Sequence, residues 1–175
     1  AYKYKLKDAA LEIQNSGKAI NVTKKKVNSK DYFFNEEGEM LSKFIEVASG
    51  NGDLSEGMYY FGGADDGSMK TGAQTVKDDN GDTYKFYFGT KNSTTETKGV
   101  GITGNKSNKL YYKGLLLTAD DYKYQIATVD NVHFFIVNKN GSIQHSCVEY
   151  KEDSDVLIDA SDLAKTAFST TEGLY

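Results

Sequence analysis

The sequence predicts an all-β protein, and more specifically an elongated β-hairpin repeat solenoid of stacked short antiparallel hairpins. Three observations predict this fold. A short phrase made of aromatic residues, a glycine-containing turn and a large apolar residue recurs along the chain. Asn and Asp stand shortly before glycine between the aromatic clusters, as hairpin turns require. The 13 tyrosines and 9 phenylalanines supply much of the apolar surface, a composition that favours strands.

The recurring phrase is clearest at residues 32–40, YFFNEEGEM, and at residues 59–69, YYFGGADDGSM. A weaker copy, HFFIVNKNGSI, covers residues 133–143. Two further aromatic clusters, 86–88 and 111–112, extend the series with a spacing of about 22 to 27 residues, a range in which repeats form stacked units. Each phrase predicts a strand, a tight turn and a second strand. Such units bury their apolar faces against neighbouring units instead of in one central core.

The expected strands follow the apolar and aromatic runs along the chain. They cover residues 2–6, 19–22, 31–35, 40–47, 58–62, 69–76, 83–88, 99–103, 109–113, 115–118, 122–129, 132–137 and 142–149. Glycine-containing turns over 35–38, 64–67, 78–81 and 138–141 separate several of these strands. The segment 159–168 is expected to form a short helix capped by Asp159 or Ser161, and the segment 8–15 a second short helix.

The chain divides into three parts on this pattern. Residues 1–30 are a partial repeat or an N-terminal cap, residues 31–149 are the β-hairpin repeats, and residues 150–175 are a partial repeat or a linker. The sequence TEGLY at 171–175 matches SEGMY at 55–59, so the chain stops where another hairpin would begin. The first residue, Ala1, is not methionine. We therefore expect a segment of a longer polypeptide, processed or cut within the repeat.

Stacking is required for stability, because a lone two-stranded hairpin is marginal in water. Each hairpin carries several large apolar side chains, and burying one of them contributes about 1.5–3 kcal/mol. Stacked hairpins bury these side chains between them, while the end units stay frayed or need caps. The sequence thus predicts a long, narrow molecule without a deep central pocket.

Composition excludes several classes of partner. The net charge is −4, and all of the positive charge comes from lysine. Because nucleic acid binding needs clustered positive charge, nucleic acid is not an expected partner. The one basic run, Lys24 to Lys26, is expected to be a solvated turn. No stretch approaches the roughly 20 apolar residues of a membrane span, so membrane insertion is not expected. The one cysteine, Cys147, forms no internal disulfide and is expected to be a small buried side chain on a strand.

Three motifs resemble chemical sites but fit a β-repeat better. The glycine pattern of 99–104 matches a dinucleotide motif, yet no helix pattern follows it and no βαβ unit surrounds it. The acidic run 78–82 resembles the start of a calcium loop, but a glycine stands at the twelfth position, where an EF-hand needs a glutamate, and the flanks are strand-like. His145 and Cys147 share a strand face without further ligands, and same-strand spacing does not favour a Cys–His nucleophile pair. We expect no metal, no cofactor and no enzymatic activity.

The phrase at 58–72 resembles a known family of repeats. Its aromatic triplet Tyr59-Tyr60-Phe61, followed by Gly67-Ser68-Met69-Lys70-Thr71-Gly72, is similar to the cell-wall-binding or choline-binding repeat of Gram-positive surface proteins. Glucan-binding repeats of streptococcal glucosyltransferases and the C-terminal repeats of clostridial toxins share the same plan. The resemblance covers most of residues 31–149, with one full copy and several degenerate ones. It implies a noncatalytic β-hairpin solenoid that holds its owner on the cell envelope.

The resemblance fails at the ligand cage. Choline-binding members hold the quaternary ammonium in a cage of aromatic rings, usually two tryptophans and a tyrosine, because the cation is attracted to ring faces. This chain has no tryptophan. Where the family has tryptophan after its glycine, this chain has Ala73 and Ile102. The hairpin plan transfers, and Met69 matches the family methionine, but the cage residues are not carried over.

Alternate residues of a strand face opposite sides, so Tyr59 and Phe61 share one face and Tyr60 takes the other. One face must be core, and any given ring is either core packing or an exposed platform on which a sugar can pack. The residues expected to bind ligand are Tyr60, Met69, Tyr87, Tyr111, Tyr112 and Tyr122.

The function expected from these residues is noncatalytic attachment to cell-wall or other polysaccharide, by a secreted, cell-wall-associated module of a Gram-positive bacterium. Many weak sites acting together would supply the affinity. The alternative is a structural stalk or adhesin module that displays another domain or binds a protein partner. A binding module should place an exposed aromatic residue at the same point of each hairpin, whereas in this sequence that position drifts.

Overall fold

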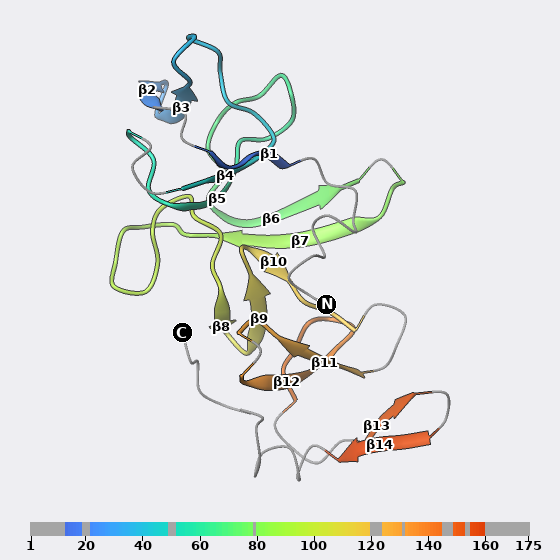
Figure 1. The fold of residues 1–175 in the computed structure, drawn as a ribbon. Helices are drawn as coiled ribbons and strands as arrows, with labels where there is room; N and C mark the ends of the chain where they lie inside the picture. The colour runs from blue at the N-terminus through green and yellow to red at the C-terminus, as the bar shows by residue number, and fades with distance from the viewer. Residues whose placement is uncertain are drawn as a thin grey trace. The chain divides into compact units, whose positions relative to one another are not determined.

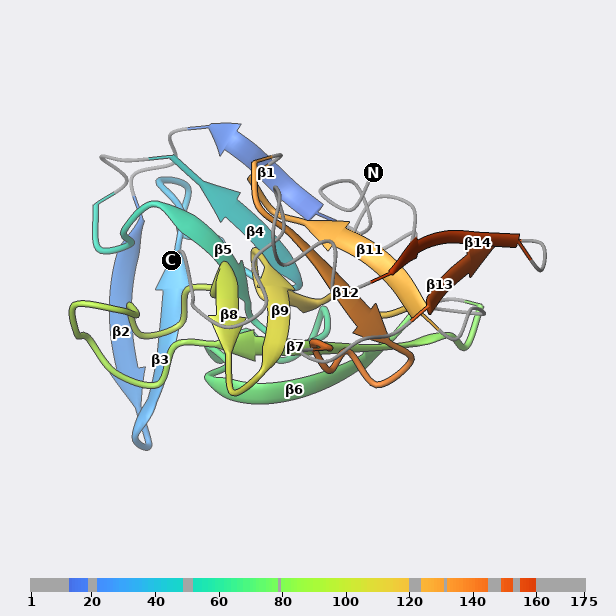
Figure 2. The same cartoon turned by 90° about the horizontal axis from the view of Figure 1, so that it is seen from below.

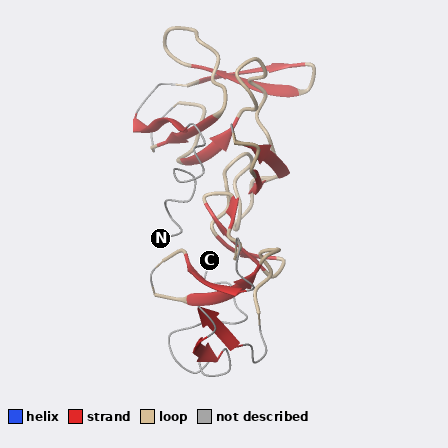
Figure 3. Cartoon of the chain, turned by 90° about the vertical axis from the view of Figure 1, so that its right-hand side faces the viewer, coloured by secondary structure: helices blue, strands red, loops and turns tan. Residues whose placement is uncertain are grey.

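The computed structural model describes residues 13–18, 22–48, 52–78, 80–119, 124–130, 132–144, 149–152 and 155–159. These residues form strands and loops and contain no helix, which confirms the all-β fold class (Figure 3). The strands are β1 (Ile13–Lys18), β2 (Thr23–Val27), β3 (Lys30–Phe34), β4 (Phe44–Val47), β5 (Gly57–Tyr60), β6 (Gly72–Lys77), β7 (Thr83–Phe88), β8 (Gly104–Lys106), β9 (Lys109–Tyr112), β10 (Leu115–Leu116), β11 (Tyr124–Thr128), β12 (Phe134–Asn138), β13 (Glu149–Glu152) and β14 (Asp155–Asp159).

The described residues fall into two compact units (Figure 1). The N-terminal unit contains residues up to 102 together with 113–115, and the C-terminal unit contains 103–112 and the residues from 116 onward. In the N-terminal unit β4 pairs antiparallel with β5 and parallel with β1, while β2–β3 and β6–β7 are antiparallel hairpins. Leu115 at the start of β10 pairs with Phe86 of β7. The C-terminal unit consists of the antiparallel pairs β8–β9, β11–β12 and β13–β14 (Figure 2).

One backbone hydrogen bond recurs in five places among the described residues and defines the repeat. An amide after a turn donates to a carbonyl in the strand before that turn, over 2.8–3.2 Å. The acceptors lie 23 to 27 residues apart, which confirms the repeat expected from the sequence. The donor–acceptor pairs, numbered as the first to fifth copies, are Leu41–Phe33, Lys70–Tyr60, Ile102–Tyr87, Leu117–Leu110 and Gln144–Ile136.

A second backbone hydrogen bond joins successive copies in the same register. Its donor is the residue just before the donor of the first bond in one copy. Its acceptor lies in the preceding copy, two residues before the acceptor of the first bond there. The donor–acceptor pairs are Met69–Asp31 and Gly101–Met58 in the N-terminal unit and Ile143–Asn108 in the C-terminal unit, at 2.8–2.9 Å. In these three junctions the backbone of one copy is therefore joined to that of the next, as in a stack of hairpins.

A glycine packed beneath an apolar side chain of the preceding copy accompanies these bonds. Met40 lies over Gly67, Met69 over Gly99 and Leu116 over Gly141, so closely that a Cβ atom at any of the three glycines would collide with the side chain above it. All three glycines have φ close to +80°, a conformation that glycine adopts without steric cost.

Three of the turns share one geometry. The side-chain oxygens of Asn35, Asp78 and Asn138 each accept hydrogen bonds from the amides two and four residues further on, at 2.9–3.1 Å. The fourth residue of each turn is a glycine with φ between +78° and +84°. The expected hairpin turns at 35–38, 78–81 and 138–141 are thus confirmed, and the residues that predicted them form the hydrogen bonds.

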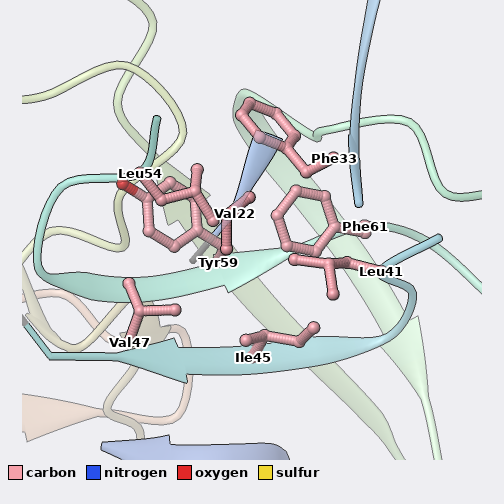
Figure 4. Close-up of a cluster of buried hydrophobic side chains, with 8 residues drawn as sticks. All are labelled: Val22, Phe33, Leu41, Ile45, Val47, Leu54, Tyr59 and Phe61. Atoms are coloured by element: carbon pink, nitrogen blue, oxygen red, sulfur yellow. The ribbon is translucent and has the colours of Figure 1, made fainter. Parts of the chain in front are cut away.

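A core cluster of eight buried residues lies in the N-terminal unit (Figure 4). Its members come from four neighbouring segments, and Met69 and Val100 pack against it. The rings of Tyr59 and Phe61 stack at 5.9 Å, and Phe33 of the first copy lies 5.5 Å from Phe61 of the second. The cluster consists of Val22, Phe33, Leu41, Ile45, Val47, Leu54, Tyr59 and Phe61.

Several expected elements are corrected by the structure. Lys24 to Lys26 lie in strand β2 and not in a turn, because Asn28 and Ser29 with φ of +50° and +64° form a two-residue hairpin turn between Val27 and Lys30. Strand β1 occupies 13–18, so residues 13–15 of the expected helix at 8–15 are in a strand. Strand β14 ends at Asp159, so the first residue of the expected helix at 159–168 is also in a strand. Strand β8 and the hairpin β13–β14 were not expected. The expected strand at 2–6 and residues 160–168 lie outside the described residues.

Candidate ligand-binding site

Tyr60 is the predicted site residue with the most complete surroundings. It ends β5, where it is half-buried, whereas its neighbours Tyr59 and Phe61 are buried in the core. The expected alternation across the strand is therefore confirmed. The ring of Tyr60 stacks on Phe44 of β4 with centroids 4.4 Å apart and planes at 22°, and it lies 6.2 Å from Phe88 of β7. Two buried phenylalanines thus hold the ring in place and leave part of it exposed.

A polar cluster lies next to Tyr60. Nζ of Lys70 is 2.7 Å from Oδ2 of Asp66, and Oδ1 of Asp66 accepts hydrogen bonds from the amide (3.0 Å) and the hydroxyl (2.5 Å) of Ser68. The Lys70 amide donates to the Tyr60 carbonyl, which fixes this cluster beside the strand. The Ser68 hydroxyl is buried and also accepts a hydrogen bond from Nζ of Lys70 at 2.8 Å. The cluster therefore presents a carboxylate and an ammonium, which are groups that can hydrogen-bond the hydroxyls of a sugar.

The charges of these groups are defined. Hydrogen bonds from Lys70 and then from Ser68 lower the pKa of Asp66 from 3.8 to about 2, so Asp66 is ionised at neutral pH. Burial raises the pKa of Tyr60, with Asp66 adding to the rise and Lys70 opposing it. The Tyr60 hydroxyl is therefore protonated at neutral pH and able to donate a hydrogen bond.

Tyr87 occupies the position in the third copy that Tyr60 occupies in the second. Both carbonyls accept the hydrogen bond that defines the repeat, from Ile102 and Lys70 respectively. Both side chains are half-buried. The corresponding residues of the first, fourth and fifth copies are Phe33, Leu110 and Ile136, which are all buried. A half-buried tyrosine thus recurs at this position in two consecutive copies.

Met69, the residue that matches the family methionine, is partly buried against the core cluster and lies over Gly99. These contacts give Met69 a packing role between two copies, and its role in ligand binding stays a prediction. Tyr111 and Tyr112 are half-buried neighbours on β9, where Tyr111 pairs with Gly104. Tyr122 lies outside the described residues.

The other motifs form parts of the β-repeat. Within 99–104 the amides of Gly99 and Gly101 donate to the carbonyls of Gly89 and Met58, and strand β8 begins at Gly104 in place of a helix. His133 pairs with Asp130 at 2.8 Å within a single turn. Among the described residues, no three His, Cys, Asp or Glu side chains lie close enough to hold a metal ion. None of these residues forms a helix long and apolar enough to cross a membrane. His145 and Cys147 lie outside the described residues.

Sequence reasoning missed the residues that support Tyr60. Phe44 lies 16 positions before Tyr60 and meets it only because β4 and β5 pair in the register Phe44↔Tyr60. Asp66, Ser68 and Lys70 occur within the copy at 59–69 or next to it, but their spacing indicated only a turn. These three residues lie in the turn and loop between β5 and β6, where strand alternation does not apply, so the sequence held no signal that would bring them together.

Comparisons with known proteins give likenesses to solved structures only. No family model matches the chain, and no curated protein sequence matches it. Among solved structures, a crystal structure of CbpF in complex with ipratropium is similar over 69% of this chain, with 23% sequence identity and a TM-score of 0.24. CbpF is a choline-binding protein, and the match covers 38% of its chain, well under two thirds of its length. A TM-score of 0.24 is too low for this likeness to carry an argument about function.

Proposed function

We propose that the chain is a noncatalytic attachment module that binds cell-wall or other polysaccharide, extracellularly, through half-buried tyrosines on successive hairpins. The observation that carries the proposal is the recurrence of Tyr60 and Tyr87 at one position of two consecutive copies. A repeated aromatic position is the feature that separates a binding array from a purely structural one.

The physical reason lies in the surroundings of Tyr60. A sugar presents an apolar face to an aromatic ring while its hydroxyls need polar partners. Phe44 and Phe88 hold the Tyr60 ring, and the neighbouring Asp66–Lys70 pair supplies an acceptor and a donor. Because these groups are already fixed by the fold, little side-chain entropy is lost on binding.

A single site of this kind is shallow and weak. Two or more such sites on one polymer chain bind with a higher effective concentration, so the avidity exceeds the affinity of each site. The proposal therefore predicts binding to a repeating polymer and little binding to the monosaccharide.

The test is retention on purified Gram-positive cell walls and on a glycan array, with Tyr60→Ala, Tyr87→Ala and the double variant. Each single variant should bind about twofold to tenfold more weakly, and the double variant should lose retention. Tyr84→Ala is the matched control, because Tyr84 is also half-buried on β7 but has no equivalent role in the repeat. No retention of the folded wild-type chain on any glycan would contradict the proposal, as would equal losses in the Tyr84 control.

The second candidate is a structural stalk or adhesin module. It is favoured by the contacts of Met40, Met69 and Leu116 with glycines of the following copies, which recur more regularly than the half-buried tyrosine. This function would be supported if the chain bound no glycan while variants at these contacts lowered its resistance to unfolding.

A further inference from the structure

The hairpin β2–β3 concentrates positive charge in a chain whose net charge is −4. We call Thr23–Phe34 the lysine hairpin. Its strand β2 contains three consecutive lysines, its strand β3 begins with Lys30, and every residue from 23 to 30 is exposed. In these positions the lysine run is an extended, fully solvated row of ammonium groups.

The geometry of the row is fixed by the fold. The two-residue turn sets the register, so that Lys26 faces Asp31 and Lys25 faces Tyr32 across the two strands. Lys24 and Lys26 lie on one face of the hairpin, about 7 Å apart along the strand, and Lys25 lies on the other. Val22 and Phe33 anchor the hairpin in the core cluster. The lysines are thus presented by a rigid base and not by a mobile loop.

Most of this charge is not neutralised within the protein. Lys24 and Lys98 share one carboxylate oxygen, Oδ2 of the buried Asp31, at 3.7 and 3.4 Å. None of the carboxylates in the described part of the chain forms an ion pair with Lys25, Lys26 or Lys30. The three glutamates of the 35–39 turn follow the opposite end of β3. A surplus of positive charge therefore remains around the β2–β3 turn.

We propose that the lysine hairpin is a binding surface for a linear polymer of phosphate groups. A single exposed ammonium–anion pair contributes little, so a useful ligand must engage several lysines at once, as a polyanion does. Lysine binds phosphate as a point charge that tolerates many orientations. This surface is separate from the tyrosines and does not depend on the function proposed for them.

Nucleic acid is the less fitting polyanion. Binding single strands without sequence preference uses aromatic rings on which bases stack. On the lysine hairpin, Nζ of Lys25 lies over the ring of Phe34, 6.0 Å from its centroid. That face of the Phe34 ring is occupied, and the hairpin's other partly exposed ring, Tyr32, lies half-buried opposite Lys25. The hairpin therefore does not present a series of open rings for successive bases.

The test is binding of fluorescently labelled long-chain inorganic polyphosphate at low ionic strength, followed by a salt titration. The wild-type chain should bind, with an affinity that falls steeply as salt rises. The triple variant Lys25→Gln, Lys26→Gln and Lys30→Gln should bind roughly tenfold to a hundredfold more weakly and with a shallower salt dependence. All three positions are exposed, so the variant should fold, which its circular dichroism and melting curve will verify.

The matched control removes the same charge elsewhere. Lys77→Gln, Lys85→Gln and Lys91→Gln change three exposed lysines on or next to β6–β7, and this variant should bind polyphosphate nearly as well as the wild type. The Tyr60→Ala, Tyr87→Ala variant should also bind it unchanged, which separates this proposal from glycan binding by the tyrosines. The proposal is overturned if the wild type does not bind polyphosphate, if both lysine variants lose affinity equally, or if single-stranded DNA of equal charge binds as tightly.

Discussion

The first and second copies of the repeat share one backbone hydrogen bond and show opposite burial. Phe33 and Tyr60 accept equivalent hydrogen bonds, as the pairs Leu41–Phe33 and Lys70–Tyr60 show. Yet Phe33 is buried while Tyr60 is half-buried. At the next position of each copy the burial is reversed, because Phe34 is half-buried and Phe61 is fully buried. The hydrogen-bond register thus follows the repeated sequence, whereas burial follows the neighbours that each copy has in the stack.

The difference has a local cause. Phe61 of the second copy packs between Phe33 and Tyr59, and the opposite face of its strand packs on Phe44 and Phe88. In the first copy Phe34 lies beneath the exposed lysine Lys25. An equivalent position in a repeat therefore does not have to be an equivalent site for a ligand.

The largest expected effect tests this reversal directly. Phe61→Ala should lower the free energy of unfolding by about 3–5 kcal/mol, because it leaves a cavity among buried rings. Phe34→Ala, at the equivalent position of the first copy, should cost clearly less. Urea denaturation of both variants gives the two values. Equal costs would show that burial follows the repeat after all.

A second measurement concerns the buried tyrosine of the second copy. Burial raises the pKa of Tyr59 to about 12, and its hydroxyl donates a hydrogen bond to the Ser55 carbonyl at 2.9 Å. Because the neutral phenol is the form that folding favours, its contribution is fully present below pH 10 and is lost as the pH rises toward 12. The loss amounts to about 2–3 kcal/mol at 1.36 kcal/mol per unit.

Denaturation curves collected below pH 10 and near pH 12 measure this loss. Tyr59→Phe is the control, and it should show a smaller decrease over the same range. If the two proteins lose stability in parallel, the loss belongs to other groups.

The two turns of the compared copies provide the third test. Gly38 and Gly67 both have φ near +80°, so replacing either by alanine should cost about 1–2 kcal/mol of backbone strain. A Cβ at Gly38 meets open space, while a Cβ at Gly67 collides with Met40. Because Met40 is a flexible side chain that is 37% exposed and can shift, Gly67→Ala should cost up to about 1 kcal/mol more than Gly38→Ala.

The added variant Met40→Ala checks the cause of this difference. In its background the extra cost of Gly67→Ala should disappear, since the side chain above the glycine has been removed. A difference that persisted would place the strain in the backbone of the 62–68 turn.

The smallest effect concerns the polar side chains of the same turns. Asp66 has its pKa lowered to about 2 by Lys70 and Ser68, so its ion pair is present above about pH 4 and is lost as the pH falls through 2. Solvent screens this exposed pair, and the change should stay below about 1 kcal/mol. The protection factors of the amides of residues 66–70, measured by hydrogen exchange, should therefore decrease as the pH falls from 4 to 2.

The sequence predicted the parts of the fold that depend on local chemistry. The turns of Asn35, Asp78 and Asn138 were expected because a side-chain acceptor followed by glycine forms the same turn in any context. Strand β7 was expected at its observed bounds, 83–88. Strand β2 was not expected, because three consecutive lysines have a low preference for strands. They are extended because the turn that follows them sets their pairing with β3.

The candidate site was predictable only in part. Alternation along β5 correctly separated Tyr60 from its buried neighbours Tyr59 and Phe61. It did not indicate Phe44, which meets Tyr60 through strand pairing, or the equivalence of Tyr60 and Tyr87, which is visible only in the hydrogen bonds from Lys70 and Ile102. Contacts between copies are long-range in sequence, and a repeat that has diverged this far does not mark them.

The contacts of Met40 with Gly67, Met69 with Gly99 and Leu116 with Gly141 also bear on how such a chain can evolve. Each junction involves only two neighbouring copies, through one bulky side chain packed on a glycine and the backbone hydrogen bond between the same copies. A duplicated or deleted copy that keeps this pair leaves the remaining junctions intact, so the number of copies can change between descendants without a new fold. The aromatic faces between junctions are then free to diverge, and relatives with the same backbone can acquire different ligands.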